Sequence, residues 1–261
     1  MRPRSLPRIF PFHPKVIFTD VDDTLTWKGK LPHETYTALA RLQQAGIAVI
    51  PVTGASAGWC DCIARTWPIE AIIGENGAFF MRRDQKGKLS CTHMLSEESR
   101  AENWQRLLKL KRDVHENFDC ARQTSDQPFR LNDIAFDIGQ DCTIQRSDAL
   151  KIAQYCRSAG ASAKVSSIHI NVWLGDYDKS STAEKLLAHY NQNQSDAIFI
   201  GDSPNDDAMF SNFGVTVGVS NVLPFINELH AAPTYVTENP GGYGFVELAN
   251  TLLDAGGVIT Q

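Results

Sequence analysis

The sequence predicts an α/β fold: a doubly wound, mostly parallel sheet interrupted by a mixed α+β insert. The first reason is a regular alternation of apolar, strand-like runs with helical stretches over residues 14–81. The second is that this alternation resumes near residue 165 and continues to the end of the chain. The third is length, because 261 residues suit one large domain or two modest ones.

The elements of the two alternating parts follow from their apolar runs and turn residues. Gly46, for example, closes a helical stretch that is followed at once by a strand-like run. In the first part we expect strands at 16–19, 47–52 and 71–73 and helices at 32–45 and 57–66. In the second part we expect a helix at 180–187 and strands at 197–200, 215–219 and 234–237.

The insert does not show this regular alternation of strands and helices. We expect helices at 97–117 and 147–158, a strand at 134–138, and a strand at 161–166 that leads back to the core. The chain therefore divides into a loose tail at 1–13, a core formed by 14–81 and 165–261, and an insert at 82–164.

Composition excludes several classes of protein. The net charge of −5 leaves no broad basic surface for nucleic acid, and no apolar run reaches membrane-spanning length. The basic, proline-broken start has no signal-type apolar stretch, which favours a cytoplasmic protein and leaves a targeting segment as the alternative. Six cysteines show no paired metal spacing, so we expect free thiols. We expect a monomer or a small homo-oligomer.

Two carboxylates end the first strand. Asp20 and Asp22 point the same way if the chain stays extended, because side chains alternate along a strand. Like charges at the end of a buried strand are costly unless a cation or a reaction needs them. Open α/β sheets bind their ligands at this edge, although an acidic turn is the alternative for this segment by itself.

A second acidic group follows strand 197–200. Asp202 comes directly after that strand, and Asp206 opens the next helix, where N-capping is the structural alternative. Capping does not explain why acids follow strands at two distant places. Because Mg²⁺ prefers oxygen ligands, we predict Asp20 and Asp202 as its first ligands.

Two further segments suit a phosphate. Thr53 and Gly54 follow strand 47–52, and a hydroxyl beside a bare backbone N–H can bind a phosphoryl oxygen. Lys179 precedes the helix at 180–187, where a cation opposes the helix dipole and needs another reason for its place. Each is more often structural when met alone.

Taken together, these motifs resemble the haloacid dehalogenase superfamily. The matching residues, in order, are Asp20, Asp22, Thr24, Thr53, Lys179, Asp202 and Asp206. The stretches at 74–78, 201–209 and 218–221 resemble the Cof-like, type IIB phosphatases of that superfamily. The resemblance implies a Rossmann-like core and a mobile α+β cap formed by the insert. Asp23 departs from the pattern, because glycine is commoner there.

The resemblance also implies the catalytic roles. Asp20 would attack phosphorus and carry a phosphoaspartyl intermediate, and Asp22 would protonate the leaving alcohol and then activate water. Thr53, Gly54 and Lys179 would bind the phosphoryl group and neutralise its charge.

The implied metal is Mg²⁺. Its ligands would be Asp20, the backbone carbonyl of Asp22 and Asp202. Asp206, and Asn205 through water, would hold those ligands in place.

The insert should select the substrate. Arg122 and Arg130 flank a polar stretch that could face the core, where an arginine suits a carboxylate or a phosphate; solvated surface arginines are the alternative. The sequence thus predicts a Mg²⁺-dependent phosphatase of a small phosphorylated metabolite, such as a sugar phosphate or mannosyl-3-phosphoglycerate. A phosphomutase of the same fold and a sugar-phosphate-binding regulator without turnover remain the alternatives.

Overall fold

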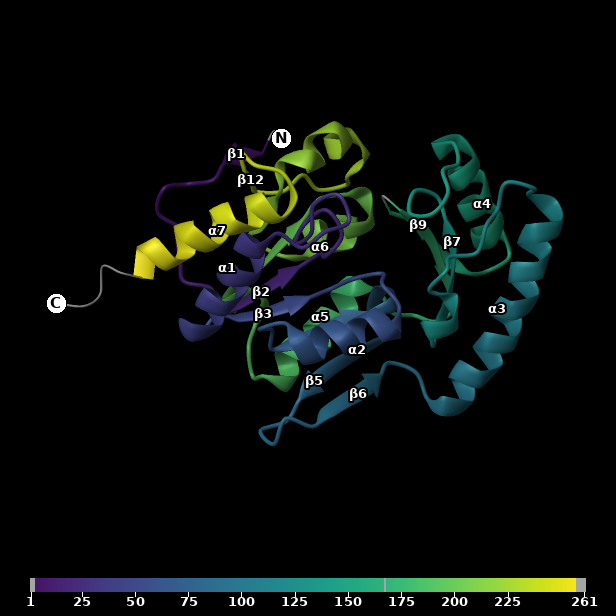
Figure 1. Cartoon of the computed structure of the whole chain (residues 1–261), viewed down its shortest axis with the longest axis horizontal. Coiled ribbons are helices and arrows are strands. Elements are labelled where there is room, and N and C mark those ends of the chain that lie inside the picture. Colours follow the sequence, from purple (N-terminus) through teal and green to yellow (C-terminus); the bar gives the residue numbers. More distant parts are fainter. Residues whose placement is uncertain (1–2, 167, 257–261) are drawn as a thin grey trace.

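The computed structural model describes residues 3–166 and 168–256, and its core is a six-stranded sheet (Figure 1). The strands lie in the order β1-β12-β11-β10-β2-β3. Their bounds are β1 Arg4–Ser5, β2 Val16–Thr19, β3 Ala48–Pro51, β10 Ala197–Gly201, β11 Thr216–Gly218 and β12 Tyr235–Val236. Every neighbouring pair is parallel, so the carboxyl ends of these strands meet at one edge of the sheet.

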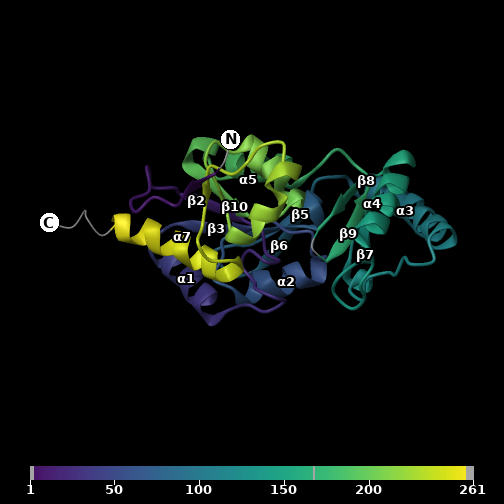
Figure 2. The same cartoon turned by 90° about the horizontal axis from the view of Figure 1, so that it is seen from above.

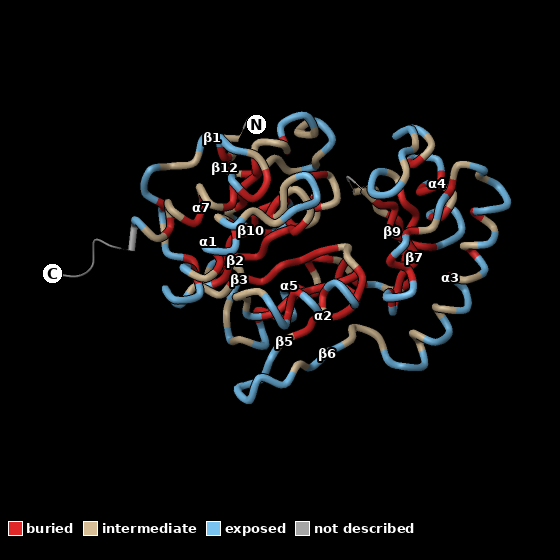
Figure 3. Tube along the Cα trace, viewed as in Figure 1, coloured by how far each residue is buried: buried red, intermediate tan, exposed pale blue. Residues whose placement is uncertain are grey.

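Helices cover both faces of this sheet, which confirms the predicted doubly wound class. On β2, Ile17 packs into the cluster that includes side chains of α1 and α7, whereas Phe18 packs into the cluster formed with α5 and α6. Figure 3 shows these strands as the buried centre of the core. The core helices are α1 His33–Gln44, α2 Ala57–Thr66, α5 Lys179–His189, α6 Asp207–Asn212 and α7 Gly241–Gly256. No helix in the described residues is long and apolar enough to cross a membrane.

A second, antiparallel sheet extends the core beyond β3. It consists of β4 Ala71–Gly74, β5 Phe79–Arg83 and β6 Leu89–His93. A single parallel bridge between Val52 and Ile73 joins it to the main sheet. Between β4 and β5 lies one turn of 3₁₀ helix, η1 Glu75–Gly77. The other 3₁₀ segments are η2 Gln127–Phe129, η3 Gln194–Asp196, η4 Pro204–Asp206 and the longer η5 Ser220–Glu228.

The insert forms a separate layer beside the core, which we call the cap. Its sheet, in the order β7-β9-β8, faces the core, and its helices α3 and α4 lie on the outer side (Figures 1 and 2). The bounds are α3 Glu97–Asn117, β7 Asp133–Asp137, α4 Arg146–Ser158, β8 Ser162–Val165 and β9 His169–Trp173. Leu107, Ile152 and Ile170 are fully buried in the apolar cluster of this layer.

The predicted domain boundaries at 81/82 and 164/165 need correction. Residues 79–93 form a hairpin on β4, so the first core segment continues past residue 81. The strand at 169–173 pairs with β7 and β8, so the cap continues to Trp173 instead of returning to the core near 165. The physical reason is that β8 and β9 pair with each other in antiparallel fashion. The sequence of an apolar strand does not predict which strand it pairs with.

The predicted loose tail at 1–13 is also wrong over the described residues. Arg4–Ser5 pairs with β12 as a parallel edge strand, and Phe10 is buried in the core. The ring of Tyr235 lies 4.8 Å from the guanidinium of Arg4 and 5.8 Å from the ring of Phe10. Apolar side chains spaced between the prolines hold the segment to the sheet edge.

Candidate active site

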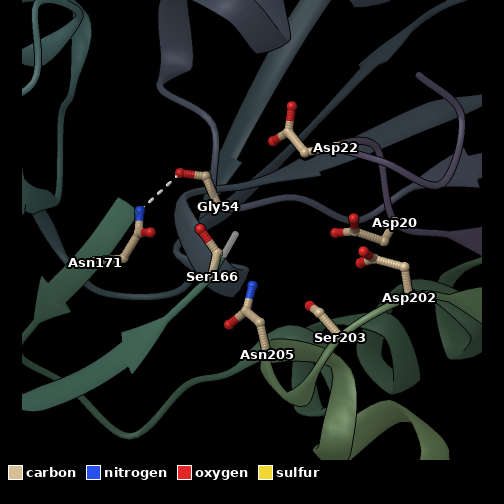
Figure 4. A pocket seen from close by; sticks show the side chains of 8 residues that line it. All are labelled: Asp20, Asp22, Gly54, Ser166, Asn171, Asp202, Ser203 and Asn205. Carbon is tan, nitrogen blue, oxygen red and sulfur yellow. Dashed lines mark hydrogen bonds between the residues drawn. The ribbon is translucent and has the colours of Figure 1, made fainter. Parts of the chain in front are cut away.

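The carboxyl ends of β2 and β10 bring Asp20 and Asp202 together. The two strands are parallel neighbours, with Thr19 beside Ile200. The backbone N–H of Asp20 donates to the carbonyl of Ile200 at 2.9 Å. Both carboxylates are buried and lie side by side in Figure 4. Their proximity follows directly from strand order and register.

Lys179 joins this centre as the first residue of α5. Its Nζ donates to Asp20 Oδ1 and to Asp206 Oδ1, each at 2.7 Å, and the lysine side chain is 3 % exposed. A cation opposes the dipole at a helix N-terminus, and Asp178 offsets this by accepting from the N–H of Ser181 at 2.7 Å. The two buried carboxylates explain why the lysine stands there.

The centre holds more negative charge than Lys179 can neutralise. Oxygens of Asp20, Asp202 and Asp206 all lie within 4.8 Å of one another. Burial, and then the charge of Asp206, raises the pKa of Asp20 to about 8. Burial, and then the charge of Asp20, raises the pKa of Asp202 well above its usual range. Three buried carboxylates beside one ammonium group are an arrangement that a divalent cation fits.

Asp22 and Asp23 follow on the turn after β2. Asp22 lines the pocket. The burial of its carboxyl group, and then the charge of Asp23, raises the pKa of Asp22 to about 6. Asp23 has φ of 55°, in the left-handed region where glycine is favoured. Its carboxylate accepts from the N–H of Lys28 at 3.1 Å, so this turn is built with aspartate where the resemblance expects glycine.

Thr53 and Gly54 lie at the same edge, after β3. Thr53 is buried, and its Oγ1 accepts from the N–H of Ala55 at 3.0 Å. Gly54 is tightly surrounded: a Cβ there would stand 3.1 Å from Nδ2 of Asn76 in the core turn η1 and 3.3 Å from Nδ2 of Asn171 on the cap. Glycine therefore lets the cap approach this loop.

A small enclosed pocket lies between the core and the cap (Figure 4). The core contributes Asp20, Asp22, Gly54, Asp202, Ser203 and Asn205, and the cap contributes Ser166 and Asn171. The pocket has room for about one water molecule, so the cap is closed in this conformation. This space is too small for a phosphate ester.

Neither predicted cap arginine lines this pocket. Arg130 is buried, and its guanidinium is held by Asp126 and Asp133 and donates to the carbonyl of Gly54 at 3.0 Å. This corrects both readings of Arg130, because it is neither solvated nor directed at a substrate. The exposed Arg122 donates instead to the backbone carbonyls of residues 119 and 121.

Besides Ser166 and Ser203 of the pocket lining, sequence reasoning missed two asparagines that hydrogen-bond at the site. Asn221 donates to Asp202 Oδ2 at 3.0 Å and to the carbonyl of Asp23 at 3.1 Å, which orients Asp202. It stands in the 218–221 stretch that carried the resemblance, which was a usable signal. Asn171 donates to the carbonyl of Gly54 at 2.9 Å, and its signal was a single polar residue between the apolar Ile170 and Val172.

The fold and the pocket define an α/β protein whose cap lies over a carboxylate-rich centre. Residues 17–125 and 122–242 match the model of the haloacid dehalogenase-like hydrolases. The chain belongs to this family of hydrolases.

Similar proteins span nearly the whole chain. It is 28% identical over 239 residues to the phosphoglycolate phosphatase of Methanothermobacter thermautotrophicus, covering 89% of this chain and 96% of that protein. It is 24% identical over 243 residues to phosphoglycolate phosphatase 1 of Saccharolobus solfataricus, covering 92% and 96%.

Two solved structures show the same fold. The structure of Thermoplasma acidophilum 0175 has a TM-score of 0.75 at 18% identity and covers 93% of this chain and 99% of that one. The sucrose-phosphatase of Synechocystis has a TM-score of 0.66 at 16% identity and covers 92% and 98%.

Proposed function

We propose that the protein is a Mg²⁺-dependent phosphatase that hydrolyses a small cytoplasmic phosphate ester through a phosphoaspartyl intermediate on Asp20. The observation that carries this proposal is the bridge from Lys179 to Asp20 and Asp206. The ammonium group holds one oxygen of Asp20 in place and screens the approach of a phosphate dianion to a buried carboxylate.

Mg²⁺ fits the residues at this centre. Asp20 and Asp202 would supply carboxylate oxygens, together with the backbone carbonyl of Asp22. Asp206 would hold the ligands in place without binding the metal itself, because its two oxygens already accept from Lys179 and from the N–H of Asp202. When bound, the metal would neutralise charge on the phosphoryl oxygens.

The chain's own residues would carry the proton and the covalent bond. An oxygen of Asp20 bonds to phosphorus while the bond from phosphorus to the leaving alcohol breaks, and Asp22 gives its proton to the alcohol oxygen. Asp22 then takes a proton from water, which attacks phosphorus and releases phosphate from Asp20. The pKa of about 6 suits Asp22 to both proton transfers near neutral pH. Thr53 and the backbone N–H of Gly54 would bind phosphoryl oxygens.

The substrate would be small. The closed pocket is narrow, and its cap side offers the hydroxyl of Ser166 and the amide of Asn171, groups that hydrogen-bond to alcohols or carboxylates. Two similar proteins are phosphoglycolate phosphatases and one similar structure is a sucrose-phosphatase. Sugar phosphates, sugar-acid phosphates such as mannosyl-3-phosphoglycerate, and short phosphorylated acids are therefore the substrates to compare.

The test is phosphate release from a panel of these compounds, with Mg²⁺ and with EDTA. Wild type should release phosphate only with the metal, and Asp20→Asn should release none. Equal release by the variant would overturn the role of Asp20. If wild type is silent on the panel and transfers phosphate within sugar bisphosphates instead, the protein is a mutase.

A further inference from the structure

The buried carboxylate of Glu75 joins the core to the cap. Glu75 is in η1, is 0 % exposed, and accepts four hydrogen bonds. Oε1 accepts from the N–H of Ala57 at 3.0 Å and of Leu131 at 2.9 Å. Oε2 accepts from the N–H and Nδ2 of Asn132, at 2.6 and 3.2 Å. Three of the four donors thus come from one loop of the cap.

A second connection lies beside it, at the carbonyl of Gly54. This oxygen accepts from Arg130 Nη1 at 3.0 Å and from Asn171 Nδ2 at 2.9 Å, both on the cap. Arg130 is itself fixed by Asp126 and Asp133, with every contact near 3.0 Å. The cap therefore presents a rigid donor to the loop that follows β3.

The two connections share one rigid piece of the core. The N–H of Glu75 donates to the carbonyl of Ala55 at 3.2 Å, and that of Asn76 donates to the carbonyl of Thr53 at 3.0 Å. Glu75 and Asn76 have φ of 46° and 56°, a conformation that L-residues hold only when their surroundings fix it. The η1 turn and the Thr53–Gly54 loop therefore move together.

These contacts must break in each turnover, because the closed pocket holds about one water and cannot admit a substrate. We propose that Glu75 is a positioning residue that latches the cap loop at 130–132 onto the phosphate-binding loop, so that the cap closes over substrates small enough to be enclosed. This inference rests on the proposed function, since closure matters only if Thr53 and Gly54 bind the phosphate.

A purely structural role is the competing explanation, because Glu75 also anchors the N-terminus of α2 through Ala57. Comparing Glu75→Gln with Asn132→Ala separates the two. Glutamine keeps the volume but replaces one acceptor oxygen with an amide donor, so two of the four donors lose their partner. Asn132→Ala weakens the latch from the cap side and leaves the core unchanged. Glu102→Gln, on the exposed face of α3, is the matched control.

The first readout is amide hydrogen exchange of the full-length protein. In Glu75→Gln the amides of Leu131 and Asn132 should exchange at least about tenfold faster, while those of β2 and β10 keep their protection. Glu102→Gln should match wild type. If the loop amides exchange at wild-type rates in both Glu75→Gln and Asn132→Ala, there is no latch.

The second readout is selectivity between a small and a bulky substrate. Acetyl phosphate is small, so the cap should return closer to the core over it than over p-nitrophenyl phosphate, whose ring should hold the cap further open. In both latch variants the ratio of kcat/KM for acetyl phosphate over p-nitrophenyl phosphate should fall about tenfold. An unchanged ratio, with both substrates losing equally, would overturn the proposal in favour of a structural role. If wild type cleaves neither these two compounds nor any compound of the substrate panel, the proposed function fails, and the exchange experiment still decides whether the latch exists.

Discussion

Replacing Lys179 with methionine should destabilise the metal-free protein strongly. The ammonium group is 3 % exposed and is the shared partner of Asp20 and Asp206, each at 2.7 Å. Methionine keeps most of the length but leaves two buried carboxylates without their cation. Breaking a buried ion pair from one side costs about 3–5 kcal/mol. A chain of this size loses roughly 2–4 °C in Tm per kcal/mol, so Tm should fall by about 10 °C.

The assay is thermal unfolding in EDTA, with Lys185→Met on the exposed face of the same helix as the control. The control should stay within about 2 °C of wild type, because exposed charges contribute little. Adding Mg²⁺ should raise the Tm of Lys179→Met more than that of wild type, since the cation then balances carboxylates that have lost their ammonium partner. A Tm for Lys179→Met equal to the control's would refute the charge-balance reasoning, and equal gains from Mg²⁺ would refute its electrostatic basis.

Three further outcomes follow from single contacts. Asn221→Ala frees one oxygen of Asp202, so the Mg²⁺ concentration for half-maximal activity should rise about tenfold or more, and an unchanged titration would contradict this. Gly54→Ala adds a Cβ 3.1–3.3 Å from the amide groups of Asn76 and Asn171 and should cost about 1–3 kcal/mol of stability in denaturant unfolding; no loss would mean that these two side chains yield freely. Burial, and then the charge of Arg130, lowers the pKa of His169 from 6.5 to about 4, so below pH 6.5 the unfolded chain binds a proton that the folded chain does not. Stability should therefore fall by about 2 kcal/mol more in wild type than in His169→Gln between pH 7 and pH 5, and parallel pH profiles would contradict it.

Much of the fold could be predicted because its elements are strongly periodic. The helix at 97–117 has the expected bounds, and the six core strands that were predicted lie within two residues of their expected positions, whereas β1, β5 and β6 were not predicted. The meeting of Asp20 and Asp202 also followed from the sequence, because both stand directly after apolar strands and parallel strands share an edge.

What the sequence could not reveal depends on partners that leave no local pattern. The strand at 169–173 looked like part of the core, because its apolar residues fit a sheet of either layer. The cap donors to Glu75 include two backbone amides more than fifty residues away, and a backbone N–H carries no sequence signal. The ion pairs of Arg130 were also hidden, because Asp126 and Asp133 reach it across a 3₁₀ turn and the start of a strand, where helix spacing does not apply.

The most direct test is a search for phosphate on Asp20. The enzyme would be quenched during turnover of acetyl phosphate with Mg²⁺ and reduced with borohydride, which converts an aspartyl phosphate to homoserine, and then read by peptide mass spectrometry. We predict homoserine at position 20 in wild type and none in EDTA or in Asp20→Asn. Active turnover with an unmodified Asp20 peptide, or with the label on another carboxylate, would contradict the role proposed for Asp20.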